Sequence, residues 1–176
     1  KLLAAIEDFI RENCCTNQTV LDVGASTGGF TDCCLQNGAR RVIAVDVGTN
    51  QLAWILRQDS RVNSLEKTDI RDLKIAEKID WVVSDVSFTS LSRVAPDIAK
   101  IASGAKGILL VKPQFELPKE LIPKGGVVED DYDRKAAVAK VELVLKDLGA
   151  TVLGKKDARV EGRSGNREIF LYCQFQ

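Results

Sequence analysis

The stretch that decides the fold is Leu21-Asp22-Val23-Gly24-Ala25-Ser26-Thr27-Gly28-Gly29-Phe30-Thr31. An apolar run ends in Asp-x-Gly, continues through a loop of small residues, and leads into a pattern typical of a helix. Glycine has no Cβ, so it lets the chain turn sharply and a ligand approach the backbone. The free N–H groups at a helix start favour polar or anionic ligand groups. The stretch therefore predicts a strand, a tight turn and a helix that bind a nucleotide-type cofactor.

Three kinds of cofactor loop can be compared with this stretch. A phosphate-binding P-loop ends in Gly-Lys-Ser/Thr, but here Gly29 is followed by Phe30. A dinucleotide fingerprint has the spacing G-x-G-x-x-G, whereas these glycines occupy positions 24, 28 and 29. The loop therefore favours S-adenosylmethionine (SAM), whose methionine part lies against such loops. The loop residues that we expect to contact the cofactor are Asp22, Gly24, Ala25, Ser26, Thr27, Gly28, Gly29 and Phe30.

Two further carboxylates are candidates for the rest of the cofactor. Residues 41–46 form an apolar run that ends in Asp46, followed by Val47, and this spacing from Gly24 suits a carboxylate that binds ribose hydroxyls. The spacing does not separate SAM from NAD, so an NAD-linked oxidoreductase remains an alternative. Asp69, followed by Ile70, could accept a hydrogen bond from an adenine amino group. Its alternative is a helix-capping or solvated loop residue.

The composition predicts one globular domain of the soluble class. The chain has 176 residues, of which 45% are hydrophobic and 28% charged. No stretch approaches the roughly 20 apolar residues of a membrane span, and no secretory signal is visible. The odd number of cysteines and the lack of C-x-x-C argue against a disulfide framework or zinc site and favour a reducing, cytoplasmic location. The cysteines are Cys14, Cys15, Cys33, Cys34 and Cys173.

Two absences and the charge balance narrow the function. The chain has no histidine, which excludes Ser-His-Asp catalysis and H-E-x-x-H metal sites, and we expect no metal. It has no methionine, even at position 1, so we expect it to begin inside a longer protein. The net charge is zero, so the field of the whole domain does not attract nucleic acid. Any such binding must come from local patches or from another module.

The hydrophobic periodicity alternates strands with helices. Strands are expected at residues 20–24, 41–46, 62–65, 79–85, 107–113, 151–156 and 168–175. Helices are expected at residues 2–10, 30–37, 51–57, 91–102 and 132–148, with Pro96 kinking or interrupting the fourth. Alternation predicts a parallel sheet with helices on both faces. The last two strands have no helix between them, so we expect them to pair antiparallel.

The predicted fold is therefore of the α/β class. It is a Rossmann-like, mostly parallel seven-stranded sheet with one antiparallel strand, the plan associated with SAM-dependent methyltransferases. In open α/β sheets, ligands bind beyond the carboxyl ends of the strands. Gly24, Asp46, Asp69, Asp85 and Lys112 fall at such ends, with Asp85 expected near the sulfonium. Lys112 alone could be a surface charge whose stem packs on apolar groups, but the other polar strand ends favour a functional role. Residues 118–126 are expected to form a mobile loop near the site.

Several further motifs carry a resemblance to a known family. They are Ala44-Val45-Asp46-Val47-Gly48, Gln51-Leu52-Ala53-Trp54, Asp85-Val86-Ser87-Phe88, Val111-Lys112-Pro113-Gln114-Phe115-Glu116, Lys124-Gly125-Gly126-Val127-Val128 and Gly165-Asn166-Arg167-Glu168. With these motifs and the opening stretch, the chain resembles the TlyA/hemolysin A-like family of FtsJ-like (RrmJ-like) RNA methyltransferases. The resemblance covers nearly the whole chain.

The resemblance implies a function and its catalytic residues. It implies ribose 2′-O-methylation of ribosomal RNA by a Lys-Asp-Lys-Glu tetrad, here Lys1, Asp85, Lys112 and Glu168, with only Lys1-Leu2 left of the first member's context. It also implies an N-terminal S4-type RNA-binding module upstream, with ribosomal RNA or ribosomal subunits as partners. No membrane partner is expected, and the oligomeric state stays open. The hemolysin name adds a membrane-lytic alternative, which would need an apolar span or an amphipathic basic helix. A non-catalytic RNA-binding domain is another.

Lys112 has two possible roles in such a reaction. As a neutral amine it could accept the proton of the 2′-hydroxyl, and as an ammonium it could stabilise the developing alkoxide. Asp85 and Glu168 would orient it in either case. Basic residues in two loops near the site could contact RNA phosphates. These basic residues are Lys119, Lys124, Lys155, Lys156, Arg159, Arg163 and Arg167.

Overall fold

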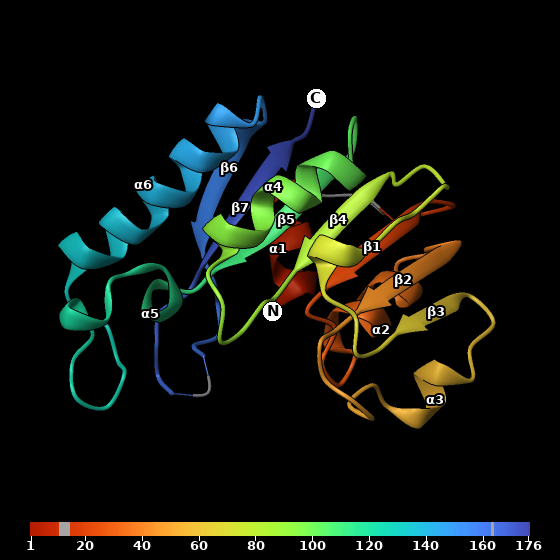
Figure 1. The fold of residues 1–176 in the computed structure, drawn as a ribbon, viewed down its shortest axis with the longest axis horizontal. Helices are drawn as coiled ribbons and strands as arrows, with labels where there is room; N and C mark the ends of the chain where they lie inside the picture. Colours follow the sequence, from red (N-terminus) through yellow and green to blue (C-terminus); the bar gives the residue numbers. More distant parts are fainter. Residues whose placement is uncertain (11–14, 163) are drawn as a thin grey trace.

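The computed structural model describes residues 1–10, 15–162 and 164–176. Within them, seven strands form one sheet in the order β3-β2-β1-β4-β5-β7-β6 (Figure 1). Two of the residues discussed above, Cys14 and Arg163, lie outside the described residues. The strands are β1 (Thr19–Val23), β2 (Arg41–Val45), β3 (Val62–Leu65), β4 (Trp81–Ser84), β5 (Lys106–Val111), β6 (Thr151–Asp157) and β7 (Ile169–Gln174).

The directions of the strands confirm the predicted sheet. β1 pairs in parallel with β2 and β4, and the β2–β3 and β4–β5 pairs are also parallel. β7 runs antiparallel to both of its neighbours, β5 and β6. The expected mostly parallel seven-stranded sheet with one antiparallel strand is therefore confirmed. The reversal of β7 brings its first residues to the edge of the sheet where the parallel strands end.

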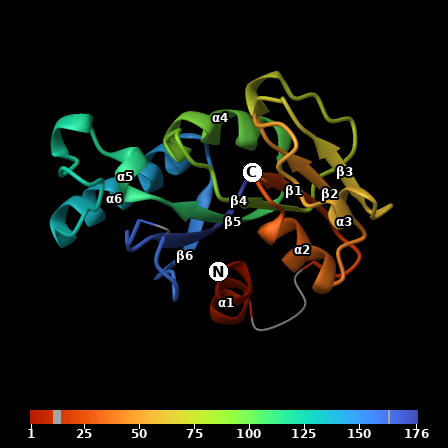
Figure 2. The same ribbon diagram turned by 90° about the horizontal axis from the view of Figure 1, so that it is seen from below.

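Helices cover both faces of the sheet (Figure 2). One face carries α1 (Leu2–Phe9), α2 (Gly29–Gln36) and α3 (Trp54–Arg57), and the other carries α4 (Leu91–Ile101) and α6 (Asp131–Asp147). Short turns complete the chain, namely α5 (Pro113–Glu116) and the 3-10 turns η1 (Ile70–Asp72) and η2 (Lys119–Leu121). In the described part of the chain, no helix has the length and apolarity needed to cross a membrane.

The two faces are filled by alternate residues of the same strands. In β5, Ile108 and Leu110 belong to the core cluster under α1 and α2, whereas Leu109 and Val111 belong to the cluster under α4 and α6. All four are fully buried, which explains why the strand is a continuous apolar run. Because side chains alternate along a strand, Lys112 continues the row of Ile108 and Leu110 toward the face that α1 covers.

The structure differs from the local predictions at three places. The helix expected at residues 51–57 is shortened to α3, because the N–H groups of Asn50, Gln51 and Leu52 donate to the Glu66 carboxylate at 2.9, 3.1 and 3.4 Å. The pKa of Glu66 is lowered by these hydrogen bonds. The strand expected to reach Pro113 stops at Val111, and Pro113 opens α5, since its fixed φ suits a first helical position. Pro96 does not interrupt α4, which continues through it.

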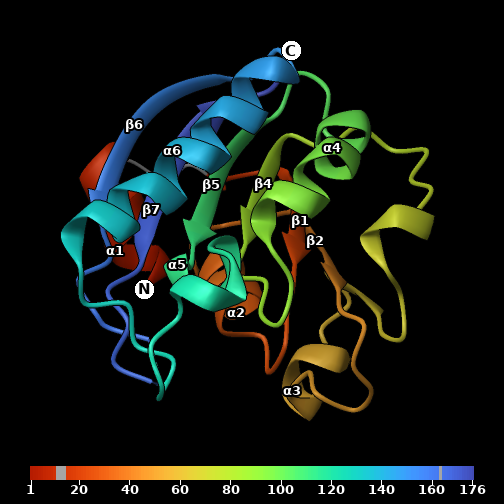
Figure 3. The same cartoon turned by 60° about the vertical axis from the view of Figure 1, so that its left-hand side comes forward.

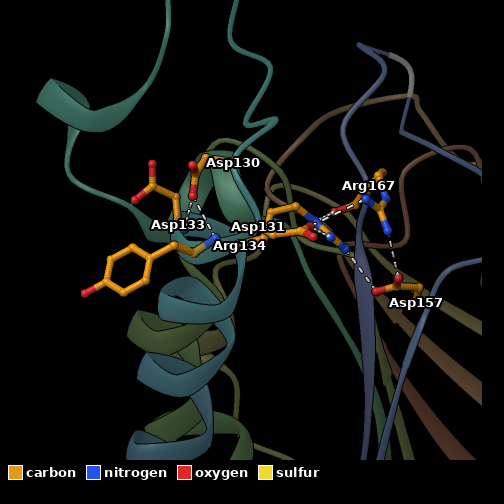
Figure 4. Close-up of polar contacts among 7 residues, drawn as sticks. Asp130, Asp131, Asp133, Arg134, Asp157 and Arg167 are labelled. Carbon is orange, nitrogen blue, oxygen red and sulfur yellow. Dashed lines mark hydrogen bonds and ion pairs between the residues drawn. The ribbon is translucent and has the colours of Figure 1, made fainter.

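An arginine network ties α6 to the antiparallel strands (Figure 4). The guanidinium of Arg134 is buried and binds Asp131 at 2.7 Å and Asp157 at 2.9 Å. Arg167 reaches the same two carboxylates, at 3.5 and 3.2 Å. Asp130 caps the helix by accepting from the N–H groups of residues 132 and 133. The start of α6 is therefore held to the end of β6 and to the residue that precedes Glu168.

Candidate active site

The carboxyl ends of β1 and β4 meet at the glycine loop. Gly24 follows β1 with φ +83°, and a Cβ there would lie 3.0 Å from Asp85 O and from Val86 Cα. Any larger residue would force the two strand ends apart. Gly24 therefore allows the loop after β1 to lie directly against the Asp85 backbone.

The rest of the loop lies where the sequence predicted it. Ser26, with φ +48°, and Thr27 are exposed, whereas Ala25 and Gly28 are buried, and Gly29 is the first residue of α2. The ring of Phe30 stacks on Phe170 with 6.2 Å between the centroids, so its side chain belongs to the core.

Asp46 holds the loop in place from the end of β2. Its two oxygens accept hydrogen bonds from the N–H groups of Ser26 and Gly48, both at 2.7 Å. The side chain is half-buried, and its neighbour Val47 is 72% exposed. A carboxylate oxygen has room for a second donor. The predicted ribose-binding carboxylate thus lies beside the glycine loop.

Asp22 lies buried beneath the loop. Its Oδ2 accepts from the Thr31 hydroxyl at 2.6 Å, and its Oδ1 has no hydrogen-bond partner among the described residues. Burial raises the pKa of Asp22 to about 7, and the nearby charges of Asp85 and Asp46 add to the rise. Three carboxyl groups and a buried unsatisfied oxygen suit a cationic ligand at this corner. SAM carries a sulfonium and an ammonium group, so the residues present fit it.

Asp69 caps the turn η1. Its Oδ1 accepts from the backbone N–H of Arg71 at 2.9 Å, and its Oδ2 pairs with the Arg71 guanidinium at 2.6 Å. The guanidinium hydrogen bond lowers the pKa of Asp69 to about 2. Ile70 is buried in the core on the α4 side. The capping role that the sequence offered for Asp69 is present, and the adenine contact stays a prediction.

The tetrad forms two ion pairs at the same end of the sheet. Lys112 Nζ lies 2.6 Å from Asp85 Oδ1 and donates to Ser87 Oγ at 2.6 Å. The Asp85 contact is an ion pair without hydrogen-bond alignment, since this oxygen accepts no hydrogen bond in the described structure. Lys1 Nζ donates to Glu168 Oε2 at 2.6 Å. Lys112 and Glu168 are 9% and 2% exposed, so each ion pair has one buried partner.

The register of β5 and β7 brings the two pairs together. Val111 and Ile169 form the last pair of the two strands, so Lys112, which follows Val111, and Glu168, which precedes Ile169, lie at the same end of the sheet. A Cβ at Gly162 would lie 2.6 Å from Glu168 Oε1, so this glycine leaves the space that the carboxylate occupies. Asn166, fully buried, accepts from Val128 N–H at 2.9 Å and donates to the carbonyl of Gly126 at 2.8 Å. The loop after η2 is therefore held against the segment that carries Glu168.

An aromatic pair with one exposed ring lies beside Lys112. Phe88 is 95% exposed and has φ +62°, which is uncommon for a bulky residue. Its ring lies 5.8 Å from that of Phe115, and Lys112 Nζ lies 6.0 Å from the Phe115 ring centre. The exposed side chain beside Lys112, that of Phe88, is thus aromatic and apolar.

Comparisons with known proteins agree with this geometry. The model of the FtsJ-like methyltransferase family matches residues 1–175. This chain belongs to the FtsJ-like methyltransferase family. The 16S/23S rRNA (cytidine-2'-O)-methyltransferase TlyA of Mycobacterium tuberculosis (strain ATCC 25618 / H37Rv) is 44% identical over 180 aligned positions, which cover 100% of this chain and 66% of the relative.

Solved structures show the same fold. A structure named as a hemolysin from Streptococcus thermophilus superposes with a TM-score of 0.94 at 39% identity, over 100% of this chain and 65% of that one. An S-adenosylmethionine dependent methyltransferase from Mesorhizobium loti superposes with a TM-score of 0.69 at 14% identity, over 97% and 96%, and shows the fold alone. The chain spans about two thirds of the length of its curated relative.

The candidate site includes three residues for which the sequence predicted no role. Thr31 binds Asp22, Ser87 binds Lys112, and Glu116 accepts from the start of α4. Ser87 and Glu116 lie within motifs that carried the resemblance to the family, so the motifs could have marked both residues as candidates for a role in the site. Their partners lie 24 to 26 positions away along the chain, so no local pattern identified the contacts.

Most of the basic residues that the sequence named as possible RNA contacts are already paired. Lys155 binds Glu142 at 3.0 Å, Arg159 binds Asp8 at 2.6 Å, and Lys156 lies 4.0 Å from Asp8. Within the described residues, Lys119 and Lys124 form no ion pair. Among residues 1–10, 15–162 and 164–176, no group of three or more His, Cys, Asp or Glu side chains could hold a metal ion.

Asp22 predicts a pH dependence of stability. Its pKa rises from 3.8 in the unfolded chain to about 7 in the folded one, so between pH 5 and 7.5 the folded protein binds more protons. The free energy of unfolding should then fall by about 2 to 3 kcal/mol as the pH rises through this window. The chain has no histidine to titrate there. Urea unfolding of wild type and Asp22→Asn at both pH values measures this. An equal fall in the variant would contradict the assignment.

Proposed function

We propose that this domain transfers a methyl group from SAM to a ribose 2′-hydroxyl of ribosomal RNA. The observation that carries the proposal is the pairing of Lys112 with Asp85 and of Lys1 with Glu168, at the sheet edge that also carries the glycine loop. Membership of the FtsJ-like methyltransferase family supports it and favours a methyl donor over NAD. The TlyA relative is named for the same reaction on cytidine.

The cofactor would be held along the ends of β1, β2 and β4. In this proposal the backbone of residues 24–30 binds the methionine part, Asp46 and Val47 the ribose, and Asp69 with Ile70 the adenine. Asp22 and Asp85 would face its positive charges. Bound SAM supplies a methyl group activated by a positively charged sulfur. The unsatisfied Oδ1 of Asp22 and the close approach at Gly24 support this arrangement.

The tetrad would act on the acceptor hydroxyl. The Lys112 amine donates to Ser87 and pairs with Asp85, which are the contacts of an ammonium group. This favours the role in which Lys112 stabilises the developing alkoxide, while proximity supplies much of the rate. The pair of Lys1 and Glu168 would fix the other side of the acceptor, since Glu168 and Lys112 adjoin the same residue pair, Val111 and Ile169.

The surface around the tetrad supports an RNA substrate. The exposed ring of Phe88, against Phe115, offers a face on which a nucleobase could stack, a contact worth about 1–3 kcal/mol in other proteins. Lys119 and Lys124 are available for phosphates. Since Lys155, Lys156, Arg159 and Arg167 are engaged in ion pairs, we propose that an upstream S4-type module provides most of the RNA affinity. A ribosomal RNA substrate corresponds to a cytoplasmic reaction.

Asp46→Ala should weaken SAM binding. The variant removes a charged acceptor for ribose hydroxyls, and hydrogen bonds to charged groups contribute roughly 1.5–3 kcal/mol. Calorimetric titration with SAM should therefore show a dissociation constant raised about tenfold to a hundredfold. Asp97→Ala, which removes a half-buried carboxylate paired with Lys100 on α4, is the matched control. Unchanged SAM affinity in Asp46→Ala would remove this residue from the site.

Lys112→Ala should abolish methyl transfer and leave SAM affinity unchanged, because Lys112 is assigned to the acceptor. The measurement is transfer of radiolabelled methyl from SAM to ribosomal subunits, together with calorimetry. Lys100→Ala, on the exposed face of α4, should transfer at the wild-type rate. Near-normal transfer by Lys112→Ala would contradict the proposed mechanism, and no transfer by the wild type would contradict the proposed function.

A further inference from the structure

The short helix α5 and the residue before it contact the loop after β4 through three side chains. This loop carries Asp85. α5 follows Lys112 directly and lies between the end of β5 and α6 (Figure 3). Lys112, Phe115 and Glu116 are spaced as i, i+3 and i+4, so their side chains share one face of the turn. The partner loop, residues 85–90, joins β4 to α4. Lys112 contacts Asp85 and Ser87 in it, and Phe115 contacts Phe88.

Glu116 makes the innermost of these contacts. Its Oε2 accepts from the hydroxyls of Ser90 and Ser92 at 2.7 and 2.6 Å, and its Oε1 accepts from the backbone N–H of Leu91 at 2.5 Å. These donors form the start of α4, where free N–H groups favour a negative charge. Glu116 is 2% exposed, in contrast to Phe88 at the outer end of the same face.

Lys140 of α6 completes the environment of this carboxylate. Its Nζ donates to the main-chain carbonyl of Glu116 at 2.6 Å and lies 3.7 Å from Oε2. The buried charge therefore has three hydrogen-bond donors and an ammonium group around it. Such a carboxylate is rigid, because moving it would leave the donors at the start of α4 without a partner.

The contacts of Glu116 affect the position of Lys112 relative to Asp85. Asp85 and Ser87 lie on a segment fixed at one end by β4 and at the other by Ser90. Lys112 lies on a segment fixed at one end by β5 and at the other by Glu116. The Glu116 carboxylate joins the two far ends, so it sets the separation between the lysine and its partners. Misplacement of reacting groups by about 1 Å can cost a hundredfold in rate.

We propose that Glu116 is a positioning residue that sets the geometry of the Lys112–Asp85 pair for methyl transfer. The inference rests on the proposed function for its kinetic consequence. The orientation of Lys112 itself can be measured in the protein without RNA or SAM. The two claims can therefore fail separately.

The kinetic test uses single-turnover methyl transfer at saturating SAM and RNA. Glu116→Ala should slow this step by about tenfold or more, since the clamp is lost, and leave the dissociation constant for SAM unchanged. Glu116→Gln should recover part of the rate, because the amide keeps an acceptor for Leu91 N–H. Glu77→Gln is the matched control, since it removes a carboxylate paired with Arg41 at the opposite edge of the sheet and should leave the rate unchanged.

The second test measures the reactivity of the Lys112 amine. Brief acylation of the native protein by an N-hydroxysuccinimide ester, followed by peptide mass spectrometry, gives the labelling of Lys112 relative to that of Lys106, the first residue of β5. Glu116→Ala should raise this ratio several-fold, because Lys112 loses its fixed contacts, whereas Glu77→Gln should not. A purely structural role for Glu116 would lower the unfolding temperature without changing the ratio in the folded protein.

The outcomes separate the two claims. A raised Lys112 labelling ratio with a slowed step supports the proposal. If Glu116→Ala does not fold, Ser92→Ala, which removes a single donor, should show both effects in smaller measure. Wild-type labelling and a wild-type rate in the folded Glu116 variants would overturn the positioning role. A raised ratio in a protein that never methylates RNA would overturn the proposed function and leave the contact intact.

Discussion

The antiparallel register of β5 and β7 is the constraint on which the site depends. Six residue pairs, from Lys106–Gln174 to Val111–Ile169, align the two strands, and Lys112 and Glu168 directly adjoin the last of these pairs. Slipping the register by one residue would turn Glu168 to the other face of the sheet. In a purely parallel sheet the start of a strand lies at the opposite edge from the strand ends. The reversal of β7 therefore allows a carboxylate at the start of β7 to lie beside a lysine after β5.

The first lysine of the tetrad depends on the packing of α1. Leu2, Ala5 and Ile6 are buried against the sheet, and Phe9 stacks on Tyr172 with 5.7 Å between the ring centroids. A Cβ at Gly154 of β6 would lie 3.2 Å from the Phe9 ring, so this glycine lets α1 lie close to the strand. The helix is thereby fixed over β6 and β7, and Lys1 at its start reaches Glu168. The free energy of apolar burial thus positions a charged group.

Much of the fold was predictable from the sequence, because it follows from local patterns. The apolar runs ending in Gly24, Asp46 and Lys112 identified the strands, and the lack of a helix between the last two strands indicated their antiparallel pairing. The ends of parallel strands share one edge, so placing these residues together needed no knowledge of side-chain contacts. The family's motifs supplied the tetrad, and the structure brings its four members into two pairs.

Other features could not be predicted because they are contacts between distant segments. Glu66 shortens α3 by binding N–H groups about 15 positions earlier in the chain. Glu116 lies in an ordinary-looking motif, and its role depends on the start of α4, which precedes it by 25 positions. Arg134 resembles any charged residue of a surface helix, yet it is buried among carboxylates from β6 and α6. Only the packed structure distinguishes such residues from solvated charges.

The most direct test of the account is the chemical position of the transferred methyl group. Ribosomal RNA methylated with radiolabelled SAM can be hydrolysed in alkali, which needs a free 2′-hydroxyl to break the adjacent phosphodiester bond. The account predicts that the label is recovered in alkali-resistant dinucleotides, because the 2′-oxygen carries the methyl group. Recovery of the label in single nucleotides, as a methylated base, would contradict the assignment of the tetrad to a ribose hydroxyl.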